Sequence, residues 1–91
     1  MLFLYVFPVD LRHLRYFVSV AEFGTASEAA QQLHISQPAL SRQIQDLQAE
    51  LGLALFEKVG RNVRLTGAGE DLLVYARTFI FFSVCFLLQR K

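Results

Sequence analysis

Residues 36–50, SQPALSRQIQDLQAE, combine one apolar stripe with a polar opposite side. The stripe repeats at the spacing of one side of an α-helix, and its members are Leu40, Ile44, Leu47 and, just beyond the quoted stretch, Leu51. Ser36 is a suitable N-cap, and Pro38 in the first turn removes no intrahelical hydrogen bond. The stretch therefore predicts a helix that packs on a core along one side only.

The polar side of this helix carries amide, hydroxyl and guanidinium groups. Its members are Pro38, Ser41, Arg42 and Gln45, with Gln37 and Gln48 at the edge. Gln can pair with the edge of adenine, Arg with guanine, and Ser with either base. The N-terminal turn after Ser36 would present unpaired N–H groups and the positive end of the helix dipole to phosphates. Alone, the pattern fits a surface helix of any small α-helical domain equally well, so the neighbouring segments decide.

Two shorter helices are predicted upstream. Apolar positions in residues 11–22, behind an N-cap at Asp10, predict the first, and residues 27–33 predict the second. The second helix ends at residue 33, only a few residues before the Ser36 cap. A connection this short requires one residue near the left-handed region of backbone conformation, which His34 tolerates better than most residues. Two helices joined by this turn, with a polar free side on the second, predict a helix-turn-helix.

A basic β-hairpin is predicted next. Residues 53–58 and 63–66 mix apolar and polar side chains around the turn formers Gly60 and Asn62. Its three cations are Lys58, Arg61 and Arg64. Solvated loops are often charged too, but beside a helix-turn-helix a basic tip favours contact with phosphates or the adjacent minor groove. The predicted fold is thus mainly α, with a three-helix core, a two-stranded β-hairpin wing and a C-terminal helix.

The run from Ala29 to Gly69 resembles the winged helix-turn-helix of LysR-type bacterial transcription regulators, and the likeness extends from about Asp10 to Thr78. It rests on these positions: Ala29-Ala30, Leu33, Ser36-Gln37-Pro38-Ala39-Leu40-Ser41, Ile44, Leu47, Leu51-Gly52, Leu55-Phe56, Leu65-Thr66 and Ala68-Gly69. The resemblance implies sequence-specific binding of double-stranded DNA as a homodimer or tetramer. It implies base and phosphate contacts from Gln37, Pro38, Ser41, Arg42 and Arg61.

Three positions depart from the family's pattern. Ala26 replaces a usual Phe, Glu28 replaces a residue that is commonly basic, and Lys58 replaces a usual Arg. The first departure predicts a smaller core. The second removes a phosphate contact and predicts weaker binding.

Charge and composition limit the function classes. The net charge is only +1, and between residues 10 and 78 seven Lys and Arg residues accompany eight Asp and Glu, so affinity for DNA must come from the placement of a few cations. The single cysteine, Cys85, cannot form an intrachain disulfide, and no Cys/His spacing suggests a metal. His13 and His34 have structural explanations, and no phosphate-binding loop or carboxylate pair favours catalysis. We expect a cytoplasmic protein that is not an enzyme and needs no cofactor or metal.

The two ends differ from the central domain at residues 10–66. Residues 1–9 form an apolar extension without the features of a signal peptide, and residues 67–91 predict a linker helix. In the LysR-type family this helix pairs two subunits, so we expect a homodimer. After Thr78 the pattern changes to the uniformly apolar FIFFSVCFLL, which predicts a truncated or frameshifted chain without an effector domain and thus without a small-molecule effector. The segment is too short for membrane insertion to be favoured over burial in an interface.

Two alternatives remain open. The chain is an interaction module whose apolar terminal helix binds another protein, or it is a nonfunctional remnant that folds poorly. Dimerisation with only weak, sequence-indifferent DNA binding would favour the first alternative. A broad, noncooperative melt would favour the second.

Overall fold

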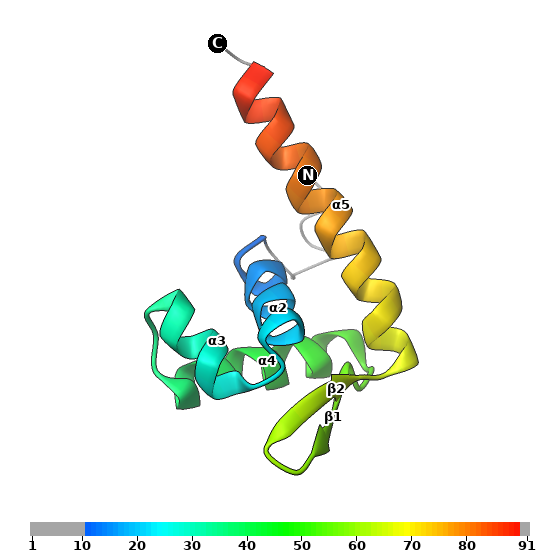
Figure 1. Ribbon diagram of the computed structural model, residues 1–91. Helices are drawn as coiled ribbons and strands as arrows, with labels where there is room; N and C mark the ends of the chain where they lie inside the picture. The colour runs from blue at the N-terminus through cyan, green and yellow to red at the C-terminus, as the bar shows by residue number, and fades with distance from the viewer. Residues whose placement is uncertain (1–10, 90–91) are drawn as a thin grey trace.

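The computed structural model describes residues 11–89, with side chains placed for residues 11–81. The elements of this part are α2 (Leu11–Phe23), α3 (Ala26–Leu33), α4 (Gln37–Leu51), β1 (Phe56–Val59), β2 (Asn62–Leu65) and α5 (Gly67–Gln89). The predicted Asp10 cap, the 1–9 extension and the Cys85 side chain lie outside the described residues. The expected fold, a mainly α winged helix-turn-helix followed by a further helix, is confirmed (Figure 1).

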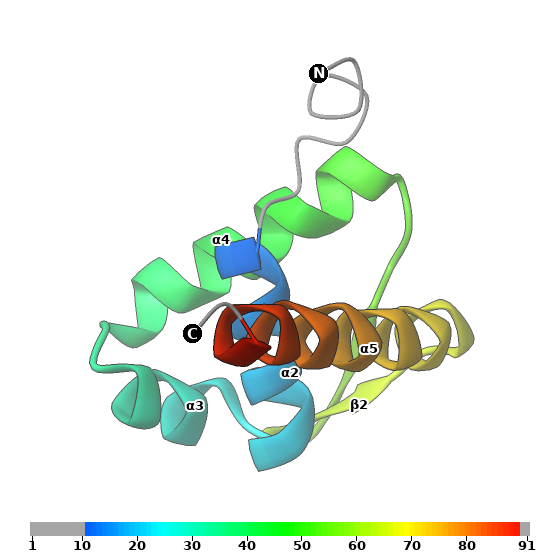
Figure 2. The ribbon, with the colours of Figure 1, turned by 90° about the horizontal axis from the view of Figure 1, so that it is seen from above.

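Helix α2 lies at the centre of the domain. It contacts α3, α4, β2 and α5, and in two views α5 passes over the side of α2 that faces away from α4 (Figures 1 and 2). The buried members of the core come from the four helices and from the connection before β1: Phe17, Val20, Ala29, Ala30, Leu40, Ile44, Leu47, Leu55 and Ala76. The ring of Phe17 packs on that of Phe56, with centroids 5.2 Å apart, so the hairpin shares the core of the helices.

Helix α4 follows its predicted pattern. The Ser36 hydroxyl accepts a hydrogen bond from the backbone N–H of Ala39 at 3.2 Å, which caps the N-terminus. Leu40, Ile44 and Leu47 are its buried residues, whereas the side with the predicted contacts remains largely in solvent. One apolar stripe therefore attaches the helix to the core and leaves its polar side accessible.

The turn between α3 and α4 uses the predicted residue. His34 has φ 61° and ψ 40°, in the left-handed region, and its conformation ends α3 just before the Ser36 cap. Helix α3 begins at Ala26, one residue earlier than predicted, because Thr25 caps it by accepting from the N–H of Glu28 at 3.1 Å. Glu28 lies in the first turn of α3, where a carboxylate interacts favourably with the helix dipole. A residue expected to weaken DNA binding thus stabilises a helix.

The hairpin is shorter at its start than predicted. Strand β1 begins at Phe56, so residues 53–55 form a connection, and the prediction of a strand from Leu53 is wrong. The two strands pair in register from Phe56↔Leu65 to Val59↔Asn62. Gly60 has φ 64°, as the first central residue of a tight type II′ turn requires, and Asn62 lies in β2 instead of the turn.

Helix α5 begins where the sequence predicts. The Thr66 hydroxyl accepts from the N–H of Gly69 at 3.1 Å and donates to the carbonyl of Ala54 at 2.6 Å. Further along, Arg77 forms an ion pair with Glu22 of α2 at 3.3 Å. The helix continues past Thr78 to Gln89. Within residues 11–89, no helix is long and apolar enough to cross a membrane.

Candidate nucleic-acid interface

The N-cap and the N-terminal turns of α4 carry six of the nine predicted contact residues on one accessible surface. We call them the reading surface: Ser36, Gln37, Pro38, Ser41, Arg42 and Gln45. All are exposed except Ser41, which is half-buried. The acidic residues of this helix, Asp46 and Glu50, lie in its second half. The N-terminal turns therefore present donors, acceptors and one cation, and the first carboxylate of this helix, Asp46, lies one turn beyond Arg42.

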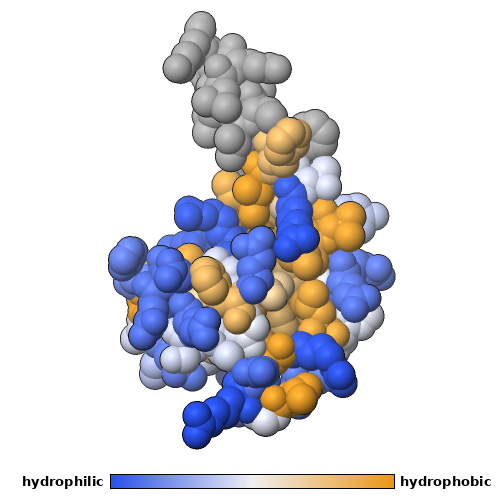
Figure 3. Space-filling model, viewed as in Figure 1, coloured by the Kyte–Doolittle hydropathy of each residue, from blue (hydrophilic) through white to orange (hydrophobic). Residues whose placement is uncertain are grey.

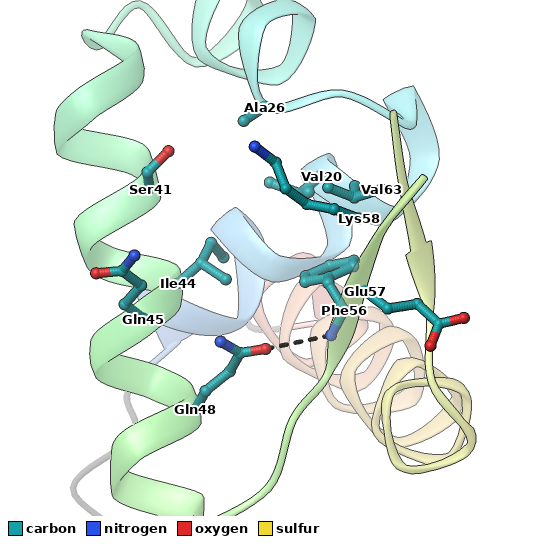
Figure 4. Close-up of a pocket in the computed structure, with 10 residues that line it drawn as sticks. All are labelled: Val20, Ala26, Ser41, Ile44, Gln45, Gln48, Phe56, Glu57, Lys58 and Val63. Atoms are coloured by element: carbon teal, nitrogen blue, oxygen red, sulfur yellow. Dashed lines mark hydrogen bonds between the residues drawn. The ribbon is translucent and has the colours of Figure 1, made fainter. Parts of the chain in front are cut away.

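A groove of about 320 Å³ separates α4 from the hairpin. Its floor is apolar and includes Val20, Ile44 and Phe56, whereas Ser41 and Gln45 line it from α4. Figure 4 shows Lys58 extending from β1 across this groove toward Ser41 and Ala26. The small side chain of Ala26 lines the groove, so the space that a larger residue would fill remains open here.

The three predicted cations of the hairpin are placed differently from one another. The register pairs Lys58 with Val63 and Glu57 with Arg64, and cross-strand partners share a face, so Lys58 and Arg64 lie on opposite faces. Lys58 faces the groove, and Arg61 occupies the tip. Arg64 donates from both Nε and Nη2 to Glu57 Oε1, at 3.0 and 2.6 Å. A contact between Arg64 and DNA would have to compete with this exposed ion pair.

Two glutamines of α4 have structural partners that sequence reasoning missed. Gln48 accepts from the backbone N–H groups of Leu55 and Phe56, at 2.8 and 3.2 Å, and so holds the connection that precedes β1. Gln43 Oε1 lies 2.7 Å from the ring Nε2 of His13, which joins α4 to α2. No sequence signal separates such amides from those that face solvent.

The pairing of Arg64 with Glu57, in contrast, could have been predicted from the sequence. A tight turn at residues 60–61 places Glu57 directly opposite Arg64, where opposite charges form a favourable cross-strand pair. Among residues 11–89, no group of three or more His, Cys, Asp and Glu side chains is arranged to hold a metal ion. The surface formed by α4 and the hairpin carries hydrogen-bonding groups and a few cations, of which Arg64 is paired with Glu57.

Comparison with known proteins assigns this arrangement to a family. Residues 11–70 match the family described as bacterial regulatory helix-turn-helix proteins, lysR family. The chain belongs to the LysR family. It is similar to the transcriptional regulator ClcR of Pseudomonas putida, with 50% identity over 72 residues, which cover 79% of this chain and 24% of that regulator.

Solved DNA-binding domains of LysR-type regulators share its fold. The BenM domain in complex with catB site 1 DNA superposes with a TM-score of 0.87 at 41% identity, covering 90% of this chain and 91% of that one. The CbnR domain in complex with DNA gives a TM-score of 0.85 at 39% identity, covering 90% and 94%. This LysR-family chain is therefore a winged helix-turn-helix DNA-binding domain, and it spans between about a quarter and a half of the length of its curated relatives. Those relatives are transcriptional regulators, not enzymes.

Proposed function

We propose that this chain binds double-stranded DNA sequence-specifically, with the first half of α4 in the major groove. The observation that carries the proposal is the reading surface, because six residues able to meet bases or phosphates lie together at the accessible N-terminal end of one helix. In this arrangement Gln37, Ser41 and Arg42 contact base edges, while Ser36 and the N-terminal N–H groups meet phosphates. The DNA complexes formed by the similar BenM and CbnR domains support binding of DNA by this fold.

The wing, composed of β1, β2 and their turn, extends this contact to the minor groove or the backbone. Arg61 at the exposed tip is the main candidate for the minor groove, and Lys58 beside Ser41 is a candidate for a phosphate. Arg64 contacts DNA only if a phosphate replaces Glu57 as the partner of its guanidinium group. This proposal divides the chain into a DNA-binding unit at residues 10–66 and a linker from residue 67.

Two such chains form a homodimer through α5. Val74, Tyr75 and Phe79 of α5 are exposed over 66%, 74% and 55% of their surface. In Figure 3 apolar side chains gather along this helix, whereas the hairpin below carries hydrophilic side chains beside apolar ones. Exposed aromatic and aliphatic side chains in such a cluster favour burial against a partner. A two-fold dimer would then contact two half-sites.

The test is selection of bound duplexes from a random pool, combined with measurement of the mass in solution. We expect one enriched half-site, repeated at a fixed spacing, and a dimer mass. Arg42→Ala should weaken binding by about 1–3 kcal/mol and relax the preference at one base position. An unchanged sequence preference in this variant would refute the role assigned to Arg42. Failure of the unsubstituted chain to enrich any sequence would refute the proposal as a whole.

The exposed apolar side of α5 also supports a second candidate, an interaction module that pairs with another protein instead of controlling DNA by itself. A dimeric chain with weak, sequence-indifferent DNA binding would favour it. Under either proposal the chain acts in the cytoplasm, where a bacterial regulator meets DNA, and it carries out no catalysis.

A further inference from the structure

Gln48 lies in the second half of α4, beside the groove, with its side chain directed at the hairpin (Figure 4). Its amide oxygen accepts two hydrogen bonds, from Leu55 N–H at 2.8 Å and from Phe56 N–H at 3.2 Å. Both partners are donors, so the geometry requires an acceptor and fixes which end of the amide faces them. One side-chain oxygen thus joins the helix with the reading surface to the first residue of the wing.

The backbone at Leu55 depends on this oxygen. Leu55 is fully buried, and its carbonyl accepts from the N–H of Thr66 at 3.0 Å, whereas its own N–H is directed to Gln48. A buried N–H without an acceptor is costly, so removal of the Gln48 oxygen forces the connection to move or to admit water. Either change alters the start of β1.

The neighbouring tethers hold other parts of the hairpin. Val63 N–H donates to the carbonyl of Gly24 at 2.9 Å, which attaches β2 to the turn after α2. Thr66 donates to the carbonyl of Ala54 at 2.6 Å, which attaches the connection to the start of α5. Among the side-chain hydrogen bonds of the described residues, those of Gln48 link the start of the hairpin to α4, whereas the backbone bond from Leu53 N–H to the Gln48 carbonyl, at 3.2 Å, holds only the beginning of the connection.

We propose that Gln48 is a positioning residue that fixes the wing against the reading helix, so that Arg61 and the reading surface engage one duplex as a rigid unit. The inference rests on the proposed function. It assigns Gln48 no contact with DNA, although this residue lies on the same side of α4 as Ser41 and Gln45. This role requires an acceptor oxygen on a side chain as long as that of glutamine, and it makes no use of the amide nitrogen.

Hydrogen exchange tests the tether without DNA. Gln48→Met keeps the length of the side chain and removes the acceptor, Gln48→Asn withdraws it by one methylene group, and Gln48→Glu retains it. We expect faster amide exchange at Leu55 and Phe56 in the Met and Asn variants and native protection in the Glu variant. Gln32→Met, at an exposed glutamine of α3, is the matched control and should change neither amide. Native protection of both amides in Gln48→Met and Gln48→Asn would overturn the proposal.

A double-mutant cycle tests the consequence for binding. Arg61→Ala should weaken binding to the selected duplex about tenfold in the native and Gln48→Glu backgrounds. In the Gln48→Met and Gln48→Asn backgrounds the same substitution should cost less than about threefold, because a displaced wing has already lost the contact. A full Arg61 penalty in both of these backgrounds would refute the positioning role alone. Absence of any duplex preference in the unsubstituted chain would instead refute the proposed function.

Discussion

Gly69 provides a sharp test of how α5 is attached to the DNA-binding unit. It is buried in the first turns of α5, and a Cβ at this position would overlap the carbonyl oxygen of Leu55 and lie 2.9 Å from Leu65 Cδ2. The Leu55 oxygen is backbone and already accepts from Thr66 N–H at 3.0 Å, so it cannot move away without loss of that bond. Gly69→Ala should therefore force α5 away from the hairpin.

The magnitude follows from three opposing contributions. Alanine in place of glycine within a helix favours folding by about 0.5–1 kcal/mol. Loss of the bond between Thr66 and Leu55 costs about 1 kcal/mol, and displacement of the packed Leu65 side chain costs about 1–3 kcal/mol. We expect the free energy of unfolding to fall by about 1–3 kcal/mol, which lowers Tm by roughly 4–8 °C per kcal/mol.

Gly67→Ala is the matched control, because a Cβ at Gly67 meets nothing within 4 Å. It should leave stability unchanged or raise it by up to about 1 kcal/mol. Urea unfolding followed by circular dichroism measures both variants, and one protein concentration must be used throughout because dimerisation shifts apparent stability. If Gly69→Ala proves as stable as Gly67→Ala, the close contact between α5 and Leu55 does not exist in solution.

Three further substitutions test other parts of the interface. Glu57→Gln should release Arg64 for one more phosphate contact, which steepens the dependence of log K on log salt concentration by about 0.9. This increase in slope should disappear in an Arg64→Ala background. An equal increase in both backgrounds would show that Glu57 acts by repulsion of DNA alone. Ala26→Phe should fill the groove and stabilise the fold by about 1–2 kcal/mol, measured by thermal melting, whereas a lower Tm would show that the groove cannot accept the ring. Tyr75→Lys should shift sedimentation from dimer to monomer without lowering helicity, and an unchanged dimer would place the interface elsewhere.

The helices could be predicted because their signals are local. The stripe from Leu40 to Leu51 defines α4, the Ser36 cap fixes its start, and the short connection requires the left-handed residue found at His34. Each of these features depends on residues within about four positions of one another. Helix-turn-helix architecture therefore followed from periodicity and capping before any tertiary contact was known.

The start of β1 could not be predicted in the same way. Residues 53–55 are apolar and continue directly into β1, but the N–H of Leu55 bonds to a side chain seven positions earlier instead of to a neighbouring strand. The position of α4 decides this choice, and propensity carries no information about it. The Glu57–Arg64 pair is an intermediate case, because the register follows from the turn once the turn is located correctly.

The reading surface ends before Gln48, although the polar pattern of α4 continues through this residue. Tertiary structure, and not the sequence pattern, sets this boundary. Ser41, Gln45 and Gln48 follow one another at helical spacing on the side of α4 that lines the groove, so periodicity treats them alike. The hairpin begins beside Gln48 and takes its oxygen for two backbone N–H groups, whereas Gln45 stays exposed and Ser41 faces Lys58. Which polar residues remain available to DNA is therefore decided by where the wing meets the helix. A hairpin displaced toward either end of α4 would change the bases that the same helix could contact.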